Sequence, residues 1–217
     1  EDGKGVRTRV EVDKILVSVG RLPNTGDMGL EAAGVTLDPG GFVTVGDWYQ
    51  TSVPSVYAIG DIIRTPLLAH VASKEGEIAV EHMAGMNPIP RLQPNRIPGA
   101  TYCEPQVASF GPTEEKLKEA GTPYAKAVFP FRGSGKAVAI EQPEGMVKVL
   151  HDPDTKEILA CHICGPSATE LLQEVLLAAQ AELLPEDIAT TVHAHPTLSE
   201  AVMEAMRAVE GWAIHAP

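Results

Sequence analysis

The stretch Met146-Val-Lys-Val-Leu-His-Asp-Pro-Asp-Thr-Lys-Glu-Ile-Leu-Ala-Cys-His-Ile163 decides the fold class of this 217-residue chain. Two mainly apolar runs flank the turn-forming residues His151-Asp-Pro-Asp154, which is typical of two antiparallel strands joined by a tight reversal. Runs of this kind predict four strands in all, at 124–129, 136–141, 146–150 and 157–163. The C-terminal half is therefore expected to contain an antiparallel sheet.

Helix signals lie before and after these strands. Thr113 is an N-cap residue for a helix over 113–120, with Gly121 beyond its end. Two apolar helices are each preceded by a capping-box pattern, Ser167 with Glu170 and Thr197 with Glu200. Pro185 begins a shorter helix between them. Separate helices beside an antiparallel sheet predict the α+β class.

The first half of the chain has a different pattern. The alternation over 6–12 predicts an exposed strand, and the apolar run Ile15-Leu-Val-Ser-Val19 predicts a buried one. Residues 53–61 read as a further buried strand that ends in a Gly-Asp turn. The spacing of small and apolar residues over 69–83 predicts a close-packed helix ended by Gly85.

Composition excludes several classes of function. The net charge is −12, so a phosphate backbone would be repelled and nucleic acid is not an expected partner. No run of 18 apolar residues is present to span a bilayer, so no membrane role is expected. The first twelve residues lack the pattern of a signal peptide and an initiator methionine, which indicates a chain that begins in mid-protein.

The three cysteines are Cys103, Cys161 and Cys164, an odd number that favours a reducing cytoplasm over a secreted disulfide framework. Cys161 and Cys164 form a CxxC pattern, which can serve zinc or redox chemistry. Here the pattern falls in a predicted strand, where residues three apart point to opposite faces. We therefore interpret both as structural cysteines.

The segment His193-Ala-His-Pro-Thr-Leu-Ser-Glu200 carries the most chemical information. It places the imidazole of His195 in a loop and the carboxylate of Glu200 within the next helix, where the two can meet. A carboxylate bound to one ring nitrogen fixes the tautomer and raises the basicity of the other nitrogen, as a general acid/base requires. Two alternatives stay open: a helix-capping Glu200 beside a loop histidine, and a zinc site of His193, His195 and Glu200.

Three ordered blocks carry a resemblance to a known family: Val19 to Thr25 (VGRLPNT), Val56 to Gly76 (VYAIGDIIRTPLLAHVASKEG) and His193 to Glu200 (HAHPTLSE). Together they resemble the C-terminal half of the dihydrolipoyl dehydrogenase family, within the class I pyridine-nucleotide disulfide oxidoreductases. The resemblance covers nearly the whole chain. It implies a remnant of an NAD-binding domain at 1–20, a central FAD-contacting domain at 21–92 and a dimer-interface domain at 93–217.

The resemblance also implies roles for individual residues. His195 would be the acid/base at a dithiol or disulfide, and Glu200 would orient and polarise it. Gly60 and Asp61 would contact FAD, with the aspartate on the ribityl chain, and Gly20, Arg21 and Asn24 with Pro23 would lie near the cofactors. The backbone at Leu68, Ala69 and His70 would lie near the flavin, at the start of a helix whose dipole favours negative charge. No metal site is expected.

The implied activity is the oxidation of protein-bound dihydrolipoyl groups through a cysteine pair and FAD to NAD⁺. Implied partners are a second copy of the protein and the lipoyl-bearing subunit of a 2-oxo acid dehydrogenase complex. The chain lacks the family's CxxxxC motif and a G-x-G-x-x-G fingerprint, so by itself it is expected to be inactive. The alternatives are a glutathione- or mercuric-reductase-like relative and, for the isolated chain, a non-catalytic dimerisation module.

Overall fold

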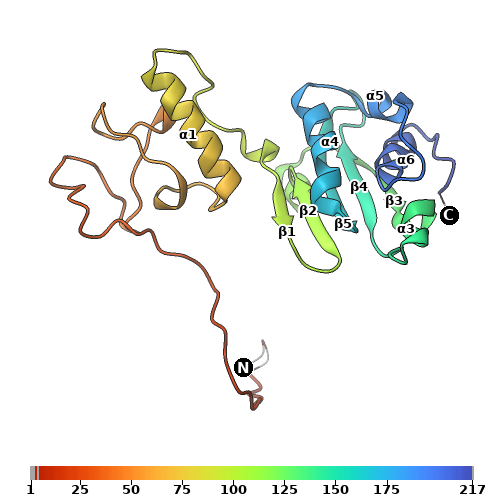
Figure 1. The fold of residues 1–217 in the computed structure, drawn as a ribbon, viewed down its shortest axis with the longest axis horizontal. Coiled ribbons are helices and arrows are strands. Elements are labelled where there is room, and N and C mark those ends of the chain that lie inside the picture. The colour runs from red at the N-terminus through yellow and green to blue at the C-terminus, as the bar shows by residue number, and fades with distance from the viewer. Residues whose placement is uncertain (1–2, 4, 217) are drawn as a thin grey trace. The chain divides into compact units, whose positions relative to one another are not determined.

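The computed structural model describes residues 3 and 5–216, and they divide into two compact units between Arg91 and Leu92 (Figure 1). We refer to them as the N-terminal and the C-terminal unit. Among the described residues, no helix is long and apolar enough to cross a lipid bilayer.

The C-terminal unit is built on one five-stranded antiparallel sheet. The strands are β1 (Gly99–Thr101), β2 (Gln106–Phe110), β3 (Ala125–Pro130), β4 (Met146–His151) and β5 (Ile158–Gly165). Their order across the sheet is β1-β2-β5-β4-β3, and the central β4–β5 hairpin pairs Val149 with Cys161. The hairpin expected at 146–163 and the α+β class are both confirmed.

Helices pack on both faces of this sheet. They are α2 (Glu114–Ala120), α3 (Gly135–Ala139), α4 (Ala168–Gln180), α5 (Pro185–Thr190) and α6 (Glu200–Val209). Helix α4 packs on β2 and β5 and α6 packs on β3 and β4, and Phe110, Val149 and Leu172 belong to the core between them. Helices α4 and α6 share this one core cluster, and α2 contributes to a second, smaller one that includes Leu117 and Leu150. Alternation along the strands divides their side chains between these two clusters.

Two predictions for this unit were wrong, and a third is met only in part. Residues 136–141 are not a strand, because α3 occupies Gly135–Ala139 and Ser134 caps it by accepting the Ala137 N–H. Ser167 does not cap α4 with its side chain, since its φ of 53° is left-handed. Glu200 accepts the Thr197 N–H as a capping box requires, but the N-cap of α6 is Ser199, and the Thr197 hydroxyl donates to Ala194 O rather than capping the helix. Thr113 does cap α2, and Gly121 ends it with a φ of 65°, as expected.

The N-terminal unit contains one long helix, α1 (Ala69–Met83), followed by Gly85 with a φ of 77°. The prediction over 69–83 is confirmed, and Val71, Ile78 and Ala79 are the buried face of this helix. Short 3-10 turns at Asp47–Tyr49 and Gly60–Ile62 pack against it.

The strands predicted in this unit do not form. Residues 6–22 contain no strand in the part of the chain that the structure describes, and Leu16 and Val19 are exposed. A buried strand needs neighbours for its N–H and C=O groups, and among the described residues no strand or isolated β-bridge pairs with residues 15–19. Residues 53–61 form only an isolated bridge, Gln50 to Tyr57, before the 3-10 turn at Gly60.

Candidate functional site

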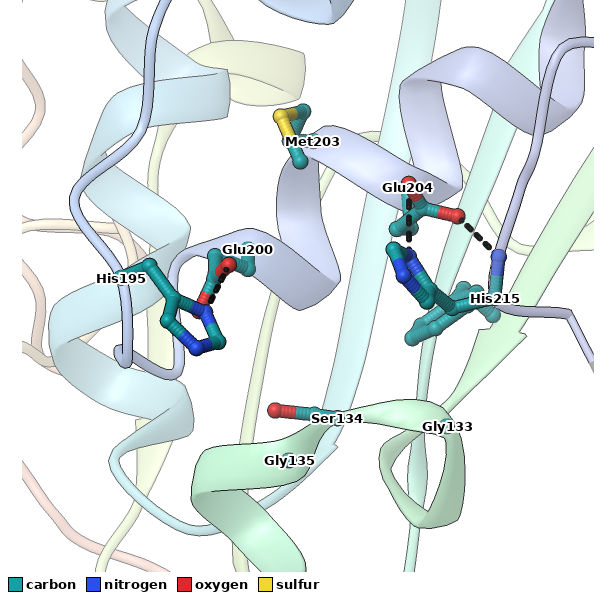
Figure 2. Close-up of a pocket in the computed structure, with 9 residues that line it drawn as sticks. Gly133, Ser134, Gly135, His195, Glu200, Met203, Glu204 and His215 are labelled. Atoms are coloured by element: carbon teal, nitrogen blue, oxygen red, sulfur yellow. Dashed lines mark hydrogen bonds and ion pairs between the residues drawn. The ribbon is translucent and has the colours of Figure 1, made fainter.

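A cavity of about 210 Å³ lies in the C-terminal unit, and Figure 2 shows the side chains around it. Its walls come from the end of β3, the segment before α3, the loop before α6, α6 itself and the C-terminal segment. The lining residues are Phe129, Gly133, Ser134, Gly135, His195, Glu200, Met203, Glu204 and His215. Five of these nine carry chemically active or hydrogen-bonding side chains, so the cavity is the candidate site.

His195 and Glu200 meet at this cavity. The distance between His195 Nδ1 and Glu200 Oε1 is 2.9 Å, and the other carboxylate oxygen accepts the Thr197 N–H at 2.8 Å (Figure 2). The His195–Pro196 peptide is cis. Thr197 also donates its hydroxyl to Ala194 O at 2.7 Å, which ties the loop together. Glu200 therefore holds both the loop backbone and the ring of His195.

The electrostatics of the pair suit proton exchange. Partial burial acts to raise the pKa of Glu200, but the Thr197 N–H and the His195 ring outweigh it, so the pKa lies below its ordinary value. The carboxylate is therefore charged at neutral pH and orients the ring through Nδ1. The His195 side chain is 76% exposed, so Nε2 is the ring nitrogen placed to exchange a proton.

His193 belongs to a different arrangement. Its Nε2 lies 2.8 Å from Glu174 Oε1 on α4, and its Nδ1 lies 2.9 Å from Thr191 O. Its side chain is buried, in contrast to that of His195. Because the two histidines bind two different carboxylates, they do not converge with Glu200 on one point. No group of three metal-ligating side chains occurs among residues 3 and 5–216.

Cys161 and Cys164 lie on β5, as expected, and both are free thiols. Cys161 is buried in the core under α4 and α6, where desolvation raises the pKa of its thiol to about 12. Cys164, three residues on, is only partly buried. Their alternate placement on the strand favours a packing role over a shared ligand or disulfide.

The cavity also contains residues that the sequence analysis missed. Glu204 lies on α6 one turn after Glu200 and is 2% exposed. It accepts N–H groups from Ile214 and His215 in the C-terminal segment. The i, i+4 spacing of the two glutamates on a predicted helix was a signal that they share a face, but nothing in the sequence pairs Glu204 with residues 214–215.

Several of the residues implied to contact FAD lie together in the N-terminal unit. Arg21 Nη1 is 2.7 Å from Asp61 Oδ2 and donates to Leu67 O at 3.2 Å, next to Leu68 at the N-cap of α1. Ala69 and His70 are the first residues of that helix, which no side chain caps at Leu68. The structure thus brings the Gly20–Arg21 loop, the turn at Asp61 and the start of α1 into one region.

The turn before Asp61 is shaped for a close approach of backbone. Gly60 has a φ of 71°, and a Cβ there would meet Ala72 Cβ at 3.2 Å, so a side chain would be strained. Its N–H donates to the buried Glu75 at 2.8 Å. The half-exposed carboxylate of Asp61 and the uncapped helix start fit a group with hydroxyls and a polar ring edge, as in FAD.

Among the described residues, Gly20 and Asn24 make no hydrogen bond to Asp61 that places them at the proposed FAD region, in contrast to Arg21. Gly20 adjoins Arg21 with a φ of 144°, and Asn24 is exposed in the following loop. Thr25, just beyond Asn24, is buried and donates its hydroxyl to Gly41 O at 2.7 Å, which anchors the loop.

The antiparallel sheet with its helices defines an α+β domain, and the match to a family model identifies its class as the dimerisation domain of disulfide oxidoreductases. Two family descriptions match the chain. "Pyridine nucleotide-disulphide oxidoreductase, dimerisation domain" matches residues 97–206, and "Pyridine nucleotide-disulphide oxidoreductase" matches residues 2–76. The chain belongs to the pyridine nucleotide-disulphide oxidoreductase family.

Within this family, the chain is most informatively compared with individual relatives and one solved structure. Dihydrolipoyl dehydrogenase 2 of Arabidopsis thaliana mitochondria is 45% identical over 211 residues, 97% of this chain and 41% of the relative. Dihydrolipoyl dehydrogenase of Thermus scotoductus is 44% identical over 97% of this chain and 45% of the relative. The crystal structure of LpdA from Mycobacterium tuberculosis has a TM-score of 0.82 and 28% identity over 88% of this chain and 41% of LpdA.

The resemblance to dihydrolipoyl dehydrogenases is thereby confirmed. The chain spans less than half the length of these relatives. The roles of individual residues and the activity of the whole protein are therefore treated as proposals below.

Proposed function

We propose that the protein to which this chain belongs oxidises protein-bound dihydrolipoyl groups, using FAD and NAD⁺, with His195 and Glu200 as its acid/base pair. The observation that carries the proposal is the 2.9 Å contact between His195 Nδ1 and Glu200 Oε1 at the wall of a cavity. The 45% identity to a dihydrolipoyl dehydrogenase supports the choice of substrate class.

Oxidation of a dithiol to a disulfide releases two electrons and two protons. When bound, FAD would supply the electron acceptor and NAD⁺ would be the final acceptor of the two electrons. The chain's own residues handle the protons: His195 Nε2 removes a proton from a thiol, and the Glu200 carboxylate stabilises the imidazolium that forms. The Thr197 N–H holds Glu200 in place while the ring charge changes.

The cofactor would be held by the N-terminal unit. Gly60 and Asp61 would approach the ribityl chain, and the start of α1 at Leu68, Ala69 and His70 would approach the flavin ring. Gly20, Arg21 and Asn24 would lie in the loop beside them. The ion pair of Arg21 with Asp61 gives this arrangement a testable contact.

We propose that two copies of the protein form a homodimer. We also propose that the dimer has the lipoyl-bearing subunit of a 2-oxo acid dehydrogenase complex as its partner. The match of residues 97–206 to a dimerisation domain supports the homodimer. Exposed apolar side chains on α4 and on the sheet, Leu177 and Val107 among them, provide surface for it. We propose the cytoplasm as location, because three free cysteines fit a reducing compartment.

The decisive experiment is His195→Gln in the full-length enzyme. General acid/base catalysis contributes roughly 10²- to 10⁴-fold, so turnover of dihydrolipoamide should fall by about that factor while FAD stays bound. Glu200→Gln should lower turnover less, because the ring keeps a hydrogen-bond acceptor. Near-normal turnover of the His195 variant, with correct folding, would refute the assignment.

Two further measurements separate the alternatives. NADH-dependent reduction of lipoamide, compared with oxidised glutathione, distinguishes a dihydrolipoyl dehydrogenase from a glutathione-reductase-like enzyme. For the 217-residue chain by itself we propose a non-catalytic dimerisation module. Sedimentation should then give a dimer and the absorption spectrum no flavin; a stoichiometric yellow flavoprotein would contradict this.

A further inference from the structure

The cavity holds a second histidine–carboxylate pair. Glu200 and Glu204 lie one turn apart on α6, so both side chains face the same direction. Glu200 binds the ring of His195, and Glu204 Oε1 lies 3.5 Å from Nδ1 of His215. Figure 2 shows the two pairs side by side around one space, with residues 133–135 along its other edge.

Glu204 is a buried carboxylate, and both of its oxygens accept hydrogen bonds. Its Oε2 accepts the Ile214 N–H at 2.8 Å and the His215 N–H at 2.9 Å, and its Oε1 accepts Arg207 Nη1 at 2.8 Å. A buried charge is tolerated only when it is paired and hydrogen-bonded, as here. Burial acts to raise the pKa of Glu204, but these partners outweigh it and the pKa lies below its ordinary value.

The C-terminal segment depends on this carboxylate for its position. Residues 212–216 contain no helix or strand, so no regular ladder holds their backbone. Two of their N–H groups end on one side chain of α6 instead. Hydrogen bonds to a charged group are stronger than hydrogen bonds between neutral groups.

The opposite side of the segment packs closely. A Cβ added to Gly133 would lie 2.7 Å from His215 O and 2.7 Å from Phe129 Cζ. The backbone of His215 therefore lies between Glu204 on α6 and the turn at Gly133. Its imidazole, 64% exposed, is left at the cavity wall.

We propose that Glu204 is a positioning residue of the acid/base site: it fixes the C-terminal segment so that His215 forms a second imidazole at the wall of the His195 cavity and contacts the substrate there. This inference rests on the proposed function for its substrate. The contact of Glu204 with the segment is independent of that function. His195 moves protons, whereas His215 adds a hydrogen-bonding contact for the bound thiol or disulfide group.

The first test uses the 217-residue chain and measures amide hydrogen exchange. In Glu204→Ala the Ile214 and His215 amides should exchange at least about tenfold faster, with protection in β4 and β5 unchanged. Glu204→Gln, which keeps an oxygen acceptor without the charge, should give a smaller increase and guards against loss of folding in the alanine variant. Glu210→Gln, on the carboxylate at the end of α6, is the matched control. Unchanged exchange at both amides in both Glu204 variants would overturn the positioning role.

The second test uses the full-length holoenzyme with dihydrolipoamide. His215→Asn and Glu204→Ala should each raise KM about tenfold with kcat near its normal value, the reverse of the kcat loss expected for His195→Gln. An unchanged KM in His215→Asn would overturn the substrate contact. If the holoenzyme does not oxidise dihydrolipoamide at all, the proposed function fails, and the exchange experiment still decides the role of Glu204.

Discussion

Cys161 shows how burial decides the chemistry of a single side chain. It lies in the core under α4 and α6, and desolvation raises the pKa of its thiol to about 12. The reactive thiolate is therefore almost absent at neutral pH. Cys103 is exposed, and Cys164 is partly buried. The CxxC spacing of Cys161 and Cys164 does not by itself predict which of the two thiols is fully buried.

We expect an aromatic disulfide reagent at about pH 8 to label Cys103 first and Cys161 only after unfolding, because the reaction requires an accessible thiolate. Peptide mass spectrometry after timed quenching measures the order. The control is the chain in denaturant, where all three cysteines should react alike. Equal labelling of Cys161 and Cys103 in the native chain would contradict the burial argument.

Residue contacts were predictable where they are local in sequence. The pairing of His195 with Glu200 followed from a loop histidine five residues before a carboxylate in the next helix, and the distance is 2.9 Å. The contacts of Glu204 with Ile214 and His215 were not predictable, because they cross an irregular segment whose path only tertiary packing determines. Ser167 failed as a cap because its backbone is left-handed.

At the scale of elements, Gly145 is required where β4 begins. Its φ is 103°, and a Cβ there would lie 1.9 Å from Cys164 O on the neighbouring strand β5. A side chain would therefore force the two central strands apart. Gly99, on edge strand β1, has space for a Cβ, with Ser109 O at an ordinary 3.7 Å.

Gly145→Ala should lower the free energy of unfolding by more than about 2 kcal/mol, because it combines backbone strain with a steric overlap in the sheet. Gly99→Ala should change it by less than about 1 kcal/mol. Urea denaturation followed by circular dichroism measures both. Equal stabilities for the two variants would show that the backbone at Gly145 relaxes without cost.

Helix α2 is tied to the sheet through Glu114, which accepts hydrogen bonds from Lys148 on β4 at 3.1 Å, Lys126 on β3 at 3.2 Å and Tyr124 at 3.2 Å. Lys148 and then Lys126 lower the pKa of Glu114 from 4.5 to about 2. A carboxyl whose pKa is depressed by folding contributes stability above its unfolded-state pKa. That contribution is lost as the pH falls through the folded-state value.

We therefore expect the stability of the native chain to fall between about pH 5 and about pH 2 more steeply than that of Glu114→Gln. Urea midpoints measured across that range test the difference. Glu119→Gln, an exposed carboxyl on the same helix, should follow the unmodified chain. If Glu114→Gln keeps the full pH dependence, the network with the two lysines does not stabilise the fold.

Helices and strands were predictable where turn or capping residues in the sequence mark where each element begins or ends. The strands at 146–150 and 157–163 were marked by a turn, and the helix at 113–120 by a cap and a terminal glycine; all three form. The run at 136–141 contains four consecutive apolar residues, as a buried strand would, but Ser134 caps a short helix there instead. The strand at 15–19 failed for a different reason, since it has no pairing partner among the described residues.

For the whole molecule, the two units differ in how much of their apolar surface they bury. The C-terminal unit has one contiguous core between the sheet, α4 and α6. The N-terminal unit includes a run of apolar side chains that are mostly exposed, among them Ile15, Leu16 and Val17. Exposed apolar runs of this kind favour association with other surfaces, whereas a contiguous core is what an independently folding domain requires.

We accordingly expect residues 92–217, produced alone, to unfold in one cooperative transition and to form a dimer by sedimentation. Residues 1–91 alone should aggregate or unfold without a cooperative transition, because their apolar run has nothing to pack against. Replacing Leu16 and Val19 by Ser should then reduce aggregation of the N-terminal fragment without affecting α1, which packs elsewhere in that unit. A non-cooperative C-terminal fragment would mean that its core depends on the rest of the chain, despite the sheet and helices that it buries by itself.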